Sequence, residues 1–345
     1  NLFNCYMSSD LTIALDAMGG DFGCSEIIPA ALFSLKKYEQ LNIVLVGKED
    51  ILHQELKKYN QQNNQRIVIT HASEIVEMDE SPSQALRNKK ESSMRRAIEL
   101  VRDGHAKACV SSGNTGALMA TARFVLKMLP GIDRPAICTT LPGKKGYTHM
   151  LDLGANVDSS SEQLFQFAIM GAQLTKAIKN IDNPTIALLN IGEEDIKGND
   201  RVKQAATLLE ASNLNYVGYV EGNYLYSGDY DVIVCDGFVG NVAIKTSEGV
   251  ADFLQHHVKK AFKNSIYSRL SALIAMPVLK SIEGKIDPKR YNGASLLGLR
   301  GIVIKSHGRA ERISFATAID EAIVEVKNNV PEKISEKLEQ LLINR

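Results

Sequence analysis

The chain has 345 residues, 44% of them hydrophobic, which is enough to bury a sizeable core and excludes a disordered protein. Lys plus Arg and Asp plus Glu both number 40, so the formal net charge is zero and no nucleic-acid partner is expected. Five widely spaced cysteines without a C-x-x-C pair indicate neither a disulfide framework nor a zinc site.

Residues 1–9 are interpreted as a tag remnant or a frayed terminus, because Met7 is a plausible native start. No run approaches the roughly 18 apolar residues of a membrane-spanning helix, and the first residues do not resemble a signal peptide. A cytoplasmic protein is therefore expected.

Short β-rich apolar runs alternate with segments of helical period along the chain. Strands are predicted at 11–15, 42–46, 66–70, 106–110, 136–140, 148–153, 185–190, 216–220, 231–235 and 302–305. Helices are predicted at 25–38, 91–102, 116–127, 161–179, 200–211, 239–262, 310–327 and 331–343. This alternation predicts a Rossmann-like α/β fold, a mostly parallel sheet sandwiched by helices, with one antiparallel hairpin at 136–153.

Residues 10–330 are expected to form one α/β catalytic unit of two interleaved lobes, because no linker or low-complexity tract interrupts them. A protruding helical region is expected at 263–290, and a C-terminal helix at 331–345. In such folds ligands bind beyond the carboxyl ends of strands. The turns that follow the predicted strands are therefore the places to search for a site.

The clearest of these turns runs from Ser111 to Ala117 and opens a predicted helix. Its small and polar residues can bind a phosphate through backbone N–H groups, with side-chain donors beside them. An ordinary N-cap needs only one such residue, so anion binding is the favoured interpretation. The predicted phosphate-binding residues are Ser112, Gly113, Asn114, Thr115 and Gly116.

Other strand ends carry similar but weaker signals. The first strand ends in Asp16 and the pair Gly19 and Gly20, which taken alone favours a plain strand-to-helix turn and lacks the dinucleotide G-x-G-x-x-G spacing. His307 follows the last predicted strand, although a lone histidine is more often structural. No metal site and no cofactor are predicted.

Two further strand ends carry candidate donors. Asn190 precedes a loop whose Lys197 is either an ordinary solvated lysine or a cation over the site. Asp236 precedes Asn241, which either caps a helix or faces the pocket. Cys235 and Ser306 are conceivable nucleophiles, but a covalent enzyme intermediate is not the favoured interpretation.

Seven ordered blocks resemble the phosphate acyltransferase family of bacterial glycerolipid synthesis, known as PlsX. They are IALDAMGGDF (13–22), MDESPSQALRNKKESSMRRAIEL (78–100), SSGNTGALMA (111–120), LDLGANVD (151–158), LLNIGEEDIKGN (188–199), VCDGFVGNVAIKTSE (234–248) and YNGASLLGLRGIVIKSHG (291–308). The resemblance implies transfer of a long-chain acyl group from acyl carrier protein to inorganic phosphate, without metal or nucleotide.

The resemblance also implies a homodimer whose fold is similar to phosphotransacetylases and isopropylmalate dehydrogenases. The residues that match the family's proposed catalytic pair are Lys197 and Asn241. The acyl phosphate would then serve a downstream membrane glycerol-3-phosphate acyltransferase.

Residues 265–282 carry apolar side chains at helical spacing, with Pro277 expected to break or kink the run. This segment either contacts the membrane or packs in the core or a dimer interface. The family resemblance favours peripheral membrane contact. The acidic carrier protein requires a basic face, for which 87–96 and 259–263 are candidates.

Overall fold

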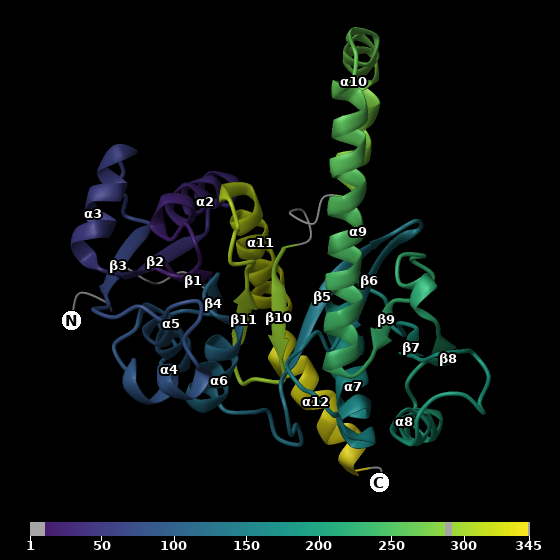
Figure 1. The fold of residues 1–345 in the computed structure, drawn as a ribbon. Coiled ribbons are helices and arrows are strands. Elements are labelled where there is room, and N and C mark those ends of the chain that lie inside the picture. The colour runs from purple at the N-terminus through teal and green to yellow at the C-terminus, as the bar shows by residue number, and fades with distance from the viewer. Residues whose placement is uncertain (1–10, 287–291, 344–345) are drawn as a thin grey trace.

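The computed structural model describes residues 11–286 and 292–343. Within them, eleven strands form one sheet with the order β3-β2-β1-β4-β11-β10-β5-β6-β9-β7-β8 (Figure 1). The strands are β1 (Thr12–Asp16), β2 (Asn42–Gly47), β3 (Ile67–His71), β4 (Ala108–Ser111), β5 (Ala136–Gly143), β6 (Gly146–Leu151), β7 (Ile186–Leu189), β8 (Tyr216–Val220), β9 (Val232–Val234), β10 (Ala294–Leu297) and β11 (Ile302–Lys305).

Two parallel halves make up this sheet. Strands β3, β2, β1, β4 and β11 run parallel, and so do β6, β9, β7 and β8. Between the halves the pairings of β11 with β10, β10 with β5 and β5 with β6 are all antiparallel. Three reversals make the two halves run in opposite directions, so their carboxyl ends do not share one edge.

Helices cover both faces of the sheet, as predicted. They are α2 (Cys24–Lys37), α3 (Glu49–Lys58), α4 (Pro82–Asn88), α5 (Ser93–Arg102), α6 (Thr115–Leu126), α7 (Ser161–Lys179), α8 (Asp200–Glu210), α9 (Gly237–Lys263), α10 (Ile266–Ile286), α11 (Arg312–Asn328) and α12 (Val330–Ile343), with a short 3-10 turn at Gly222–Tyr224. In the first half, α2 and α11 bury one face and α5 and α6 the other. In the second, α7 and α12 cover one face and α9 reaches the other.

Alternation along the strands explains how each half holds two layers of core. Ile13 and Leu15 of β1 pack beneath α2 and α11, while Ala14 between them faces the α5 and α6 side. Ile233 and Val234 of β9 likewise enter opposite clusters. A strand buried on both faces is apolar throughout, which is why the parallel strands are recognisable in the sequence.

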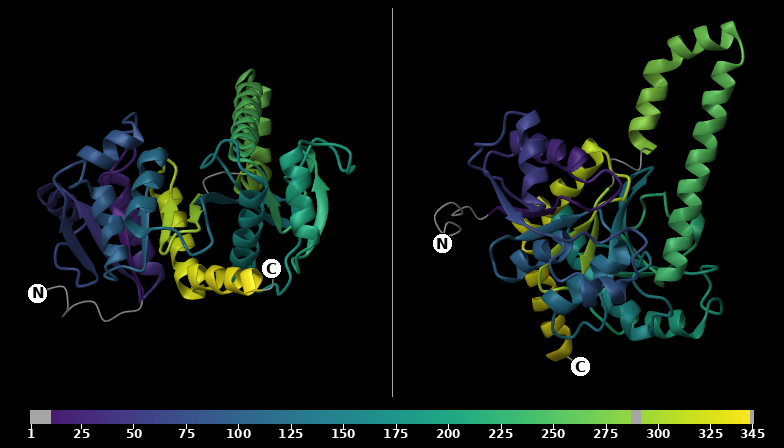
Figure 2. Two further views of the ribbon diagram at one scale, coloured as in Figure 1. Left: turned by 90° about the horizontal axis from the view of Figure 1, so that it is seen from below. Right: turned by 60° about the vertical axis from the view of Figure 1, so that its left-hand side comes forward.

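Helices α9 and α10 form a hairpin that stands away from the body of the molecule (Figures 1 and 2). Pro277 was predicted to break or kink the 265–282 run; it does not break it, because α10 continues through it from Ile266 to Ile286. Large apolar side chains on the hairpin are exposed to solvent: Val250, Phe253, Leu254, Val258, Tyr267, Leu270, Leu273, Ile274, Met276 and Val278.

The remaining predicted segments are placed as follows. The C-terminal helix α12 packs against α7, so it belongs to the second half. Of the protruding region 263–290, Lys263 ends α9 and residues 266–286 form α10, with a two-residue turn between them, and residues 287–290 fall outside the described part of the chain. The predicted tag remnant at 1–9 also lies outside the described residues.

Candidate active site

In the first half, the turns after β1 and β4 are joined by a chain of buried hydrogen bonds. The hydroxyl of Ser111 donates to Asp16 Oδ2 at 2.6 Å and accepts from the N–H of Gly113 at 3.1 Å. Ser112 donates its hydroxyl to the carbonyl of Gly19 at 2.9 Å. The predicted residues Asp16, Gly19, Ser112 and Gly113 therefore lie together, but the hydroxyl of Ser112 is already engaged within the protein.

Gly20 needs its lack of a side chain in this turn. Its φ is +78°, in the region that favours glycine, and a Cβ there would meet the hydroxyl of Ser112 at 2.6 Å and the carbonyl of Gly308 at 2.8 Å. The N–H of Asp21 donates to the same carbonyl at 2.8 Å. The turns after β1, β4 and β11 thus interlock around Gly20.

Helix α6 begins at Thr115, directly after this cluster, and Asn114 is its N-cap. The Asn114 side chain accepts from the N–H of Ala117 at 3.0 Å and donates to the carbonyls of Met78 and Glu80 at 2.8 and 2.9 Å. The capping interpretation of Asn114 is therefore correct. The first-turn N–H groups of Thr115 and Gly116 have no acceptor within the helix, so the backbone of this turn offers hydrogen-bond donors.

The turn after β11 adds a buried cation. Lys305 is 9% exposed, and its ammonium donates to the carbonyl oxygens of Ser112, at 3.4 Å, and of Ser306. Burial lowers the pKa of Lys305 to about 8, with Lys245 adding to the decrease and Asp16 opposing it. The amide of Asn292 donates to Ser306 Oγ at 2.7 Å and accepts from the N–H of His307 at 2.9 Å.

His307 is on the surface of this turn. Its Nδ1 accepts from the N–H of Arg309 at 3.1 Å. Partial desolvation lowers the pKa of His307, and the nearby charges of Lys305 and Lys245 lower it further. The predicted residue is therefore grouped with Gly20 and Ser112 rather than isolated.

In the second half, Asp152 organises the turn that follows β6. Its buried carboxylate accepts from the N–H groups of Ile137 at 2.9 Å, Leu153 at 2.7 Å and Asn156 at 2.7 Å. It also accepts from the N–H of Ala155 at 3.2 Å and from the side-chain amide of Asn156 at 2.9 Å. Burial raises the pKa of Asp152 above its usual value, and these donors oppose that rise. The carboxylate therefore fixes the backbone of this turn.

Asp236, not Asn241, caps α9. Asp236 Oδ1 accepts from the N–H of Phe238 at 2.9 Å, and Oδ2 accepts from the N–H of Ser159 at 2.7 Å. The helix begins at Gly237, two residues earlier than predicted, so the capping interpretation of Asn241 is wrong. The Asn241 side chain is exposed and lies against Gly154, whose added Cβ would be 3.5 Å from that of Asn241.

Helix α9 connects the two halves of the site. Asn241 and Lys245 share one face of α9 because they are four residues apart. The charge of Lys245 lowers the pKa of both Lys305 and His307, which lie at the end of β11 in the first half. Leu153 and Ala155 also pack against the core cluster that contains Ala117 of α6. The 111–116, 305–308 and 152–156 turns and the start of α9 therefore form one region.

Lys197 lies in a loop that folds back on itself. Its ammonium pairs with Glu194 at 2.9 Å, its side chain is 43% exposed, and that hydrogen bond raises its pKa. The amide of Asn190 donates to the carbonyl of Lys197 at 3.2 Å. Within the described residues, Lys197 forms its hydrogen bonds and its ion pair inside this loop, and no contact joins it to Asn241 or to the 111–116 turn.

The two conceivable nucleophiles are poorly suited to covalent catalysis. The thiol of Cys235 is buried and donates to the carbonyl of Asp152 at 3.4 Å, and burial raises its pKa well above the usual value. Ser306 is fully buried and its hydroxyl accepts from Asn292. Neither group is positioned as an activated, accessible nucleophile.

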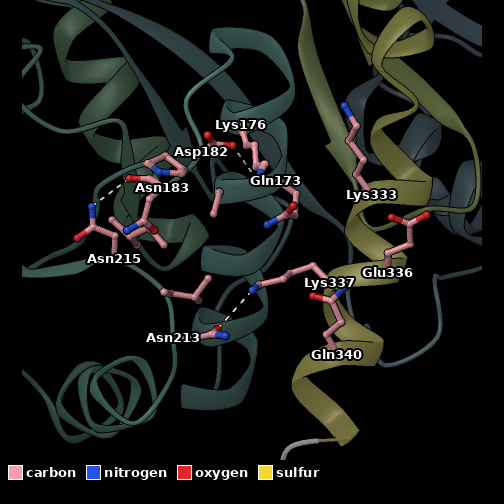
Figure 3. A pocket seen from close by; sticks show the side chains of 14 residues that line it. Gln173, Lys176, Asp182, Asn183, Asn213, Asn215, Lys333, Glu336, Lys337 and Gln340 are labelled. Carbon is pink, nitrogen blue, oxygen red and sulfur yellow. Dashed lines mark hydrogen bonds and ion pairs between the residues drawn. The ribbon is translucent and has the colours of Figure 1, made fainter.

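A cavity of about 340 Å³ lies elsewhere, between α7, α12 and the loops that precede β7 and β8 (Figure 3). Gln173, Asn183, Lys333 and Lys337 are among its lining residues. These loops enter the amino ends of their strands, whereas Asp236 follows the carboxyl end of β9. The cavity is therefore separate from the strand-end region described above.

Lys305, Asp152 and Lys245 were not among the residues predicted for the site. Each stands inside a block quoted above, and Lys305 ends a predicted strand directly before His307. For Lys305 the available signal is its position, because a lysine that ends an otherwise apolar buried strand is unusual. The sequence holds no comparable signal for Lys245, because its place depends on the direction of α9.

The described residues include neither a metal-binding cluster nor a membrane-spanning helix. Across 11–286 and 292–343, no group of three or more His, Cys, Asp or Glu side chains is arranged to hold a metal ion. In the same ranges, every helix is too short or too polar to cross a membrane.

The fold is similar to that of phosphotransacetylases and of a group of α/β dehydrogenases. A phosphotransacetylase from Streptococcus pyogenes superposes with a TM-score of 0.62 at 17% identity, covering 94% of this chain and 97% of that one. A branched-chain phosphotransacylase from Enterococcus faecalis gives 0.55 at 14% identity, covering 92% and 99%. A 4-hydroxythreonine-4-phosphate dehydrogenase from Klebsiella pneumoniae gives 0.52 at 15% identity, covering 93% and 99%. The predicted fold class is confirmed.

Sequence comparison identifies the family. A family model described as "Fatty acid synthesis protein" matches residues 11–333. The phosphate acyltransferase of Alkalilimnicola ehrlichii is 56% identical over 97% of this chain and 98% of its own length. The enzyme of the same name from Legionella pneumophila strain Paris is 56% identical over 96% of this chain and 98% of its own. The chain belongs to the phosphate acyltransferase family, as the sequence blocks indicate.

Proposed function

We propose that the protein transfers a long-chain fatty acyl group from acyl carrier protein to inorganic phosphate. The observation that carries this proposal is the 56% identity to phosphate acyltransferases over 97% of the chain, within a family described by fatty acid synthesis. The grouping of the 111–116, 305–308 and 152–156 turns with α9 supports it, because this region combines helix N–H groups with cations.

The reaction needs an anion site and a donor for new negative charge. A phosphate oxygen attacks the thioester carbonyl, a C–O bond forms, the C–S bond breaks, and the phosphopantetheine thiolate leaves. In this proposal the first-turn N–H groups of Thr115 and Gly116 bind phosphate, and the amide of Asn241 donates to the tetrahedral oxyanion. No covalent enzyme intermediate and no cofactor is required.

Lys197 is proposed as the second donor to that oxyanion. Its ammonium is held by Glu194 at 2.9 Å, so this role requires the pair to open and the 190–199 loop to move toward Asn241. An exposed ion pair of this kind contributes little to stability, which makes opening inexpensive. Asn190 and Asp236 then serve the loop and the start of α9 rather than the substrate.

The α9–α10 hairpin is proposed as the apolar contact surface. Its exposed side chains, among them Phe253, Leu270 and Ile274, are 61%, 54% and 83% exposed. Such an exposed apolar surface favours peripheral contact of 265–282 with a membrane, or burial in a homodimer. A protein associated with the cytoplasmic membrane surface could pass its reactive acyl phosphate to a membrane glycerol-3-phosphate acyltransferase.

The acyl carrier protein requires a basic docking face. Of the two candidates, the 87–96 segment has Arg95 and Arg96 paired with Glu99 and Glu91. Lys259, Lys260 and Lys263 are exposed at the end of α9, so we favour this second face.

The test uses the purified full-length protein with long-chain acyl carrier protein and radiolabelled phosphate, without metal or nucleotide. An acid-labile, lipid-soluble phosphate product supports the proposal, and its absence refutes it. A parallel reaction with acetyl and butyryl coenzyme A separates this activity from a short-chain phosphotransacylase, which would favour those donors. Asn241→Ala serves as the control for adventitious acyl transfer.

A further inference from the structure

Lys305 is a buried cation whose charge is only partly compensated. Its side chain is 9% exposed and its ammonium contacts two carbonyl oxygens, those of Ser112 and Ser306. Within the described residues, no carboxylate oxygen forms an ion pair with it inside 4.0 Å. Asp16 is near enough to raise its pKa, yet Asp16 Oδ1 is buried without a hydrogen-bond partner among those residues.

Burying a lysine in this way is costly unless something compensates the charge. Such a group is therefore kept where its charge has a use, most often at a functional site. The two carbonyls that Lys305 holds belong to different turns, 111–116 and 305–308. Lys305 thus adds a side-chain link between the turn that starts α6 and the turn that carries His307, beside the bond from the N–H of Ser306 to the carbonyl of Ser111 at 2.8 Å.

Other charges surround the same region. Lys245 of α9 is near enough for its charge to lower the pKa of Lys305 and of His307, and it pairs with Glu248 at 2.8 Å. Arg309 pairs with Asp21 at 3.3 Å on the other side of His307. Burial lowers the pKa of Lys305 and of His307, and the neighbouring positive charges lower both further, which is the electrostatic condition that a bound anion relieves.

We propose that inorganic phosphate binds between the 111–116 turn, the 305–308 turn and the Lys245 face of α9, with Lys305 as the buried residue that positions both turns. This inference rests on the proposed function for the identity of the anion, but its geometry comes from the contacts of Lys305. Lys305 supplies a fixed positive charge behind the turns and does not touch the reacting atoms. It is a positioning residue.

The experiment compares wild type with Lys305→Met, Lys305→Arg and Lys179→Met. Lys179 is the matched control, because it is 14% exposed and its ammonium donates to the carbonyl of Tyr147 at 2.6 Å and to Asp231 at 2.9 Å, at the opposite end of the second half. Phosphate binding is measured without acyl donor, as the rise in melting temperature with added inorganic phosphate against chloride at matched ionic strength. This readout does not depend on turnover.

We expect wild type and Lys179→Met to be stabilised by phosphate and Lys305→Met to lose at least about tenfold in phosphate affinity. In turnover assays Lys305→Met should raise KM for phosphate more than it lowers kcat. Stabilisation of Lys305→Met equal to that of wild type would overturn the inference, and so would the absence of any phosphate effect on wild type. A wild type that binds phosphate but forms no acyl phosphate would refute the proposed function and leave this site standing.

The arginine variant keeps the inference testable if Lys305→Met does not fold. Lys305 has a pKa of about 8, so its charge is present below pH 8 and disappears as the pH rises through that value. Wild-type phosphate affinity should therefore weaken from pH 7.5 to 9.5. In Lys305→Arg the charge persists over this range, and the alkaline loss should be smaller; an identical loss in both proteins would contradict the role assigned to Lys305.

Discussion

Asp236 is the N-cap of α9, and the side chain of Asn241, five positions later, lies against Gly154. The two side chains therefore have different roles, although both residues follow β9. Asp236→Ala removes a cap that holds both Phe238 and Ser159, and it should cost about 1 kcal/mol of unfolding free energy. Asn241→Ala should leave the melting temperature within a degree or two of wild type.

Enzymatic turnover, unlike stability, should depend on Asn241. If Asn241 donates to the oxyanion, Asn241→Ala lowers kcat about 10²- to 10³-fold, the effect of losing one such donor. Steady-state kinetics with acyl carrier protein and phosphate, beside thermal unfolding of both variants, provide the measurement. Full activity in Asn241→Ala would remove this residue from the mechanism.

Gly240 is required because α9 passes directly over the turn after β6. A Cβ at Gly240 would overlap the carbonyl oxygen of Asp152 and approach the sulfur of Cys235. Gly240→Ala should therefore cost several kcal/mol or prevent folding. Gly249, in the same helix, has open space around it, so Gly249→Ala should be neutral or stabilising by up to about 1 kcal/mol.

Chemical unfolding of the two glycine variants tests this contrast. Equal stability of Gly240→Ala and Gly249→Ala would show that α9 can move away from Asp152 without cost. The start of α9 would then be mobile, and Asn241 would not be held in place.

Much of the fold is predictable because its strands are buried on both faces. The runs at 11–15, 42–46 and 231–235 are apolar except for Thr12, Asn42 and Asp231, and each overlaps a strand in the structure. The hairpin at 136–153 is also confirmed, since Gly143 and Gly146 pair across its turn. Strand β10 is missed because its four residues, Ala294–Leu297 (ASLL), include no β-branched or aromatic side chain to mark a strand.

That one strand changes how the site is assembled. Counting β10, three antiparallel pairings separate the parallel halves, so the turns after β4 and β9 do not share an edge. The sequence predicts which turns carry chemistry, but their convergence depends on sheet direction and on α9. Local patterns do not report that long-range geometry, which is why Lys245 was missed and why Lys197 stays in its own loop.

Acid should destabilise the protein partly through His149. Its imidazole is buried, its Nδ1 contacts the hydroxyl of Thr175 at 2.7 Å, and burial lowers its pKa to about 3. Between pH 6.5 and 3 the unfolded chain binds a proton that the folded chain does not. Stability is therefore fully present above pH 6.5 and falls as the pH decreases.

The variant His149→Gln retains an amide that can bond Thr175 and cannot titrate. Its unfolding free energy, measured in urea at pH 7.5 and pH 5, should decrease by about 1 to 2 kcal/mol less than that of wild type. An equal decrease in both proteins would assign the acid sensitivity to other groups.

Glu325 should lower the stability of the protein as the pH rises, whereas His149 lowers it as the pH falls. It is buried on α11, hydrogen bonds with Ser295 of β10, and burial together with Glu321 raises its pKa to about 8. The folded protein then holds a proton that the unfolded chain releases above about pH 4.5, so stability is lost as the pH rises toward 8. Glu325→Gln should remove part of this loss.

The loss of stability caused by Glu325 is measured by the melting temperatures of wild type and Glu325→Gln at pH 6 and pH 8. Glu325→Gln should gain stability relative to wild type at pH 8 and gain less at pH 6. Glu332→Gln, exposed on α12, is the control and should follow wild type at both values. A constant difference between Glu325→Gln and wild type would mean that the carboxyl group does not titrate in this range.

The last prediction concerns Lys197 and the ion pair that holds it. If Lys197 must leave Glu194 to reach the oxyanion, then Lys197→Ala should lower kcat about 10²-fold or more, while Glu194→Gln should maintain or raise it. The double variant should behave like Lys197→Ala, because Glu194 acts only by holding the lysine. Since the pair is exposed, none of the three changes should alter the melting temperature by more than a few degrees. A Glu194→Gln variant as inactive as Lys197→Ala would instead show that the loop is needed in the conformation that the pair maintains, with Lys197 supporting the 190–199 loop from outside the reaction.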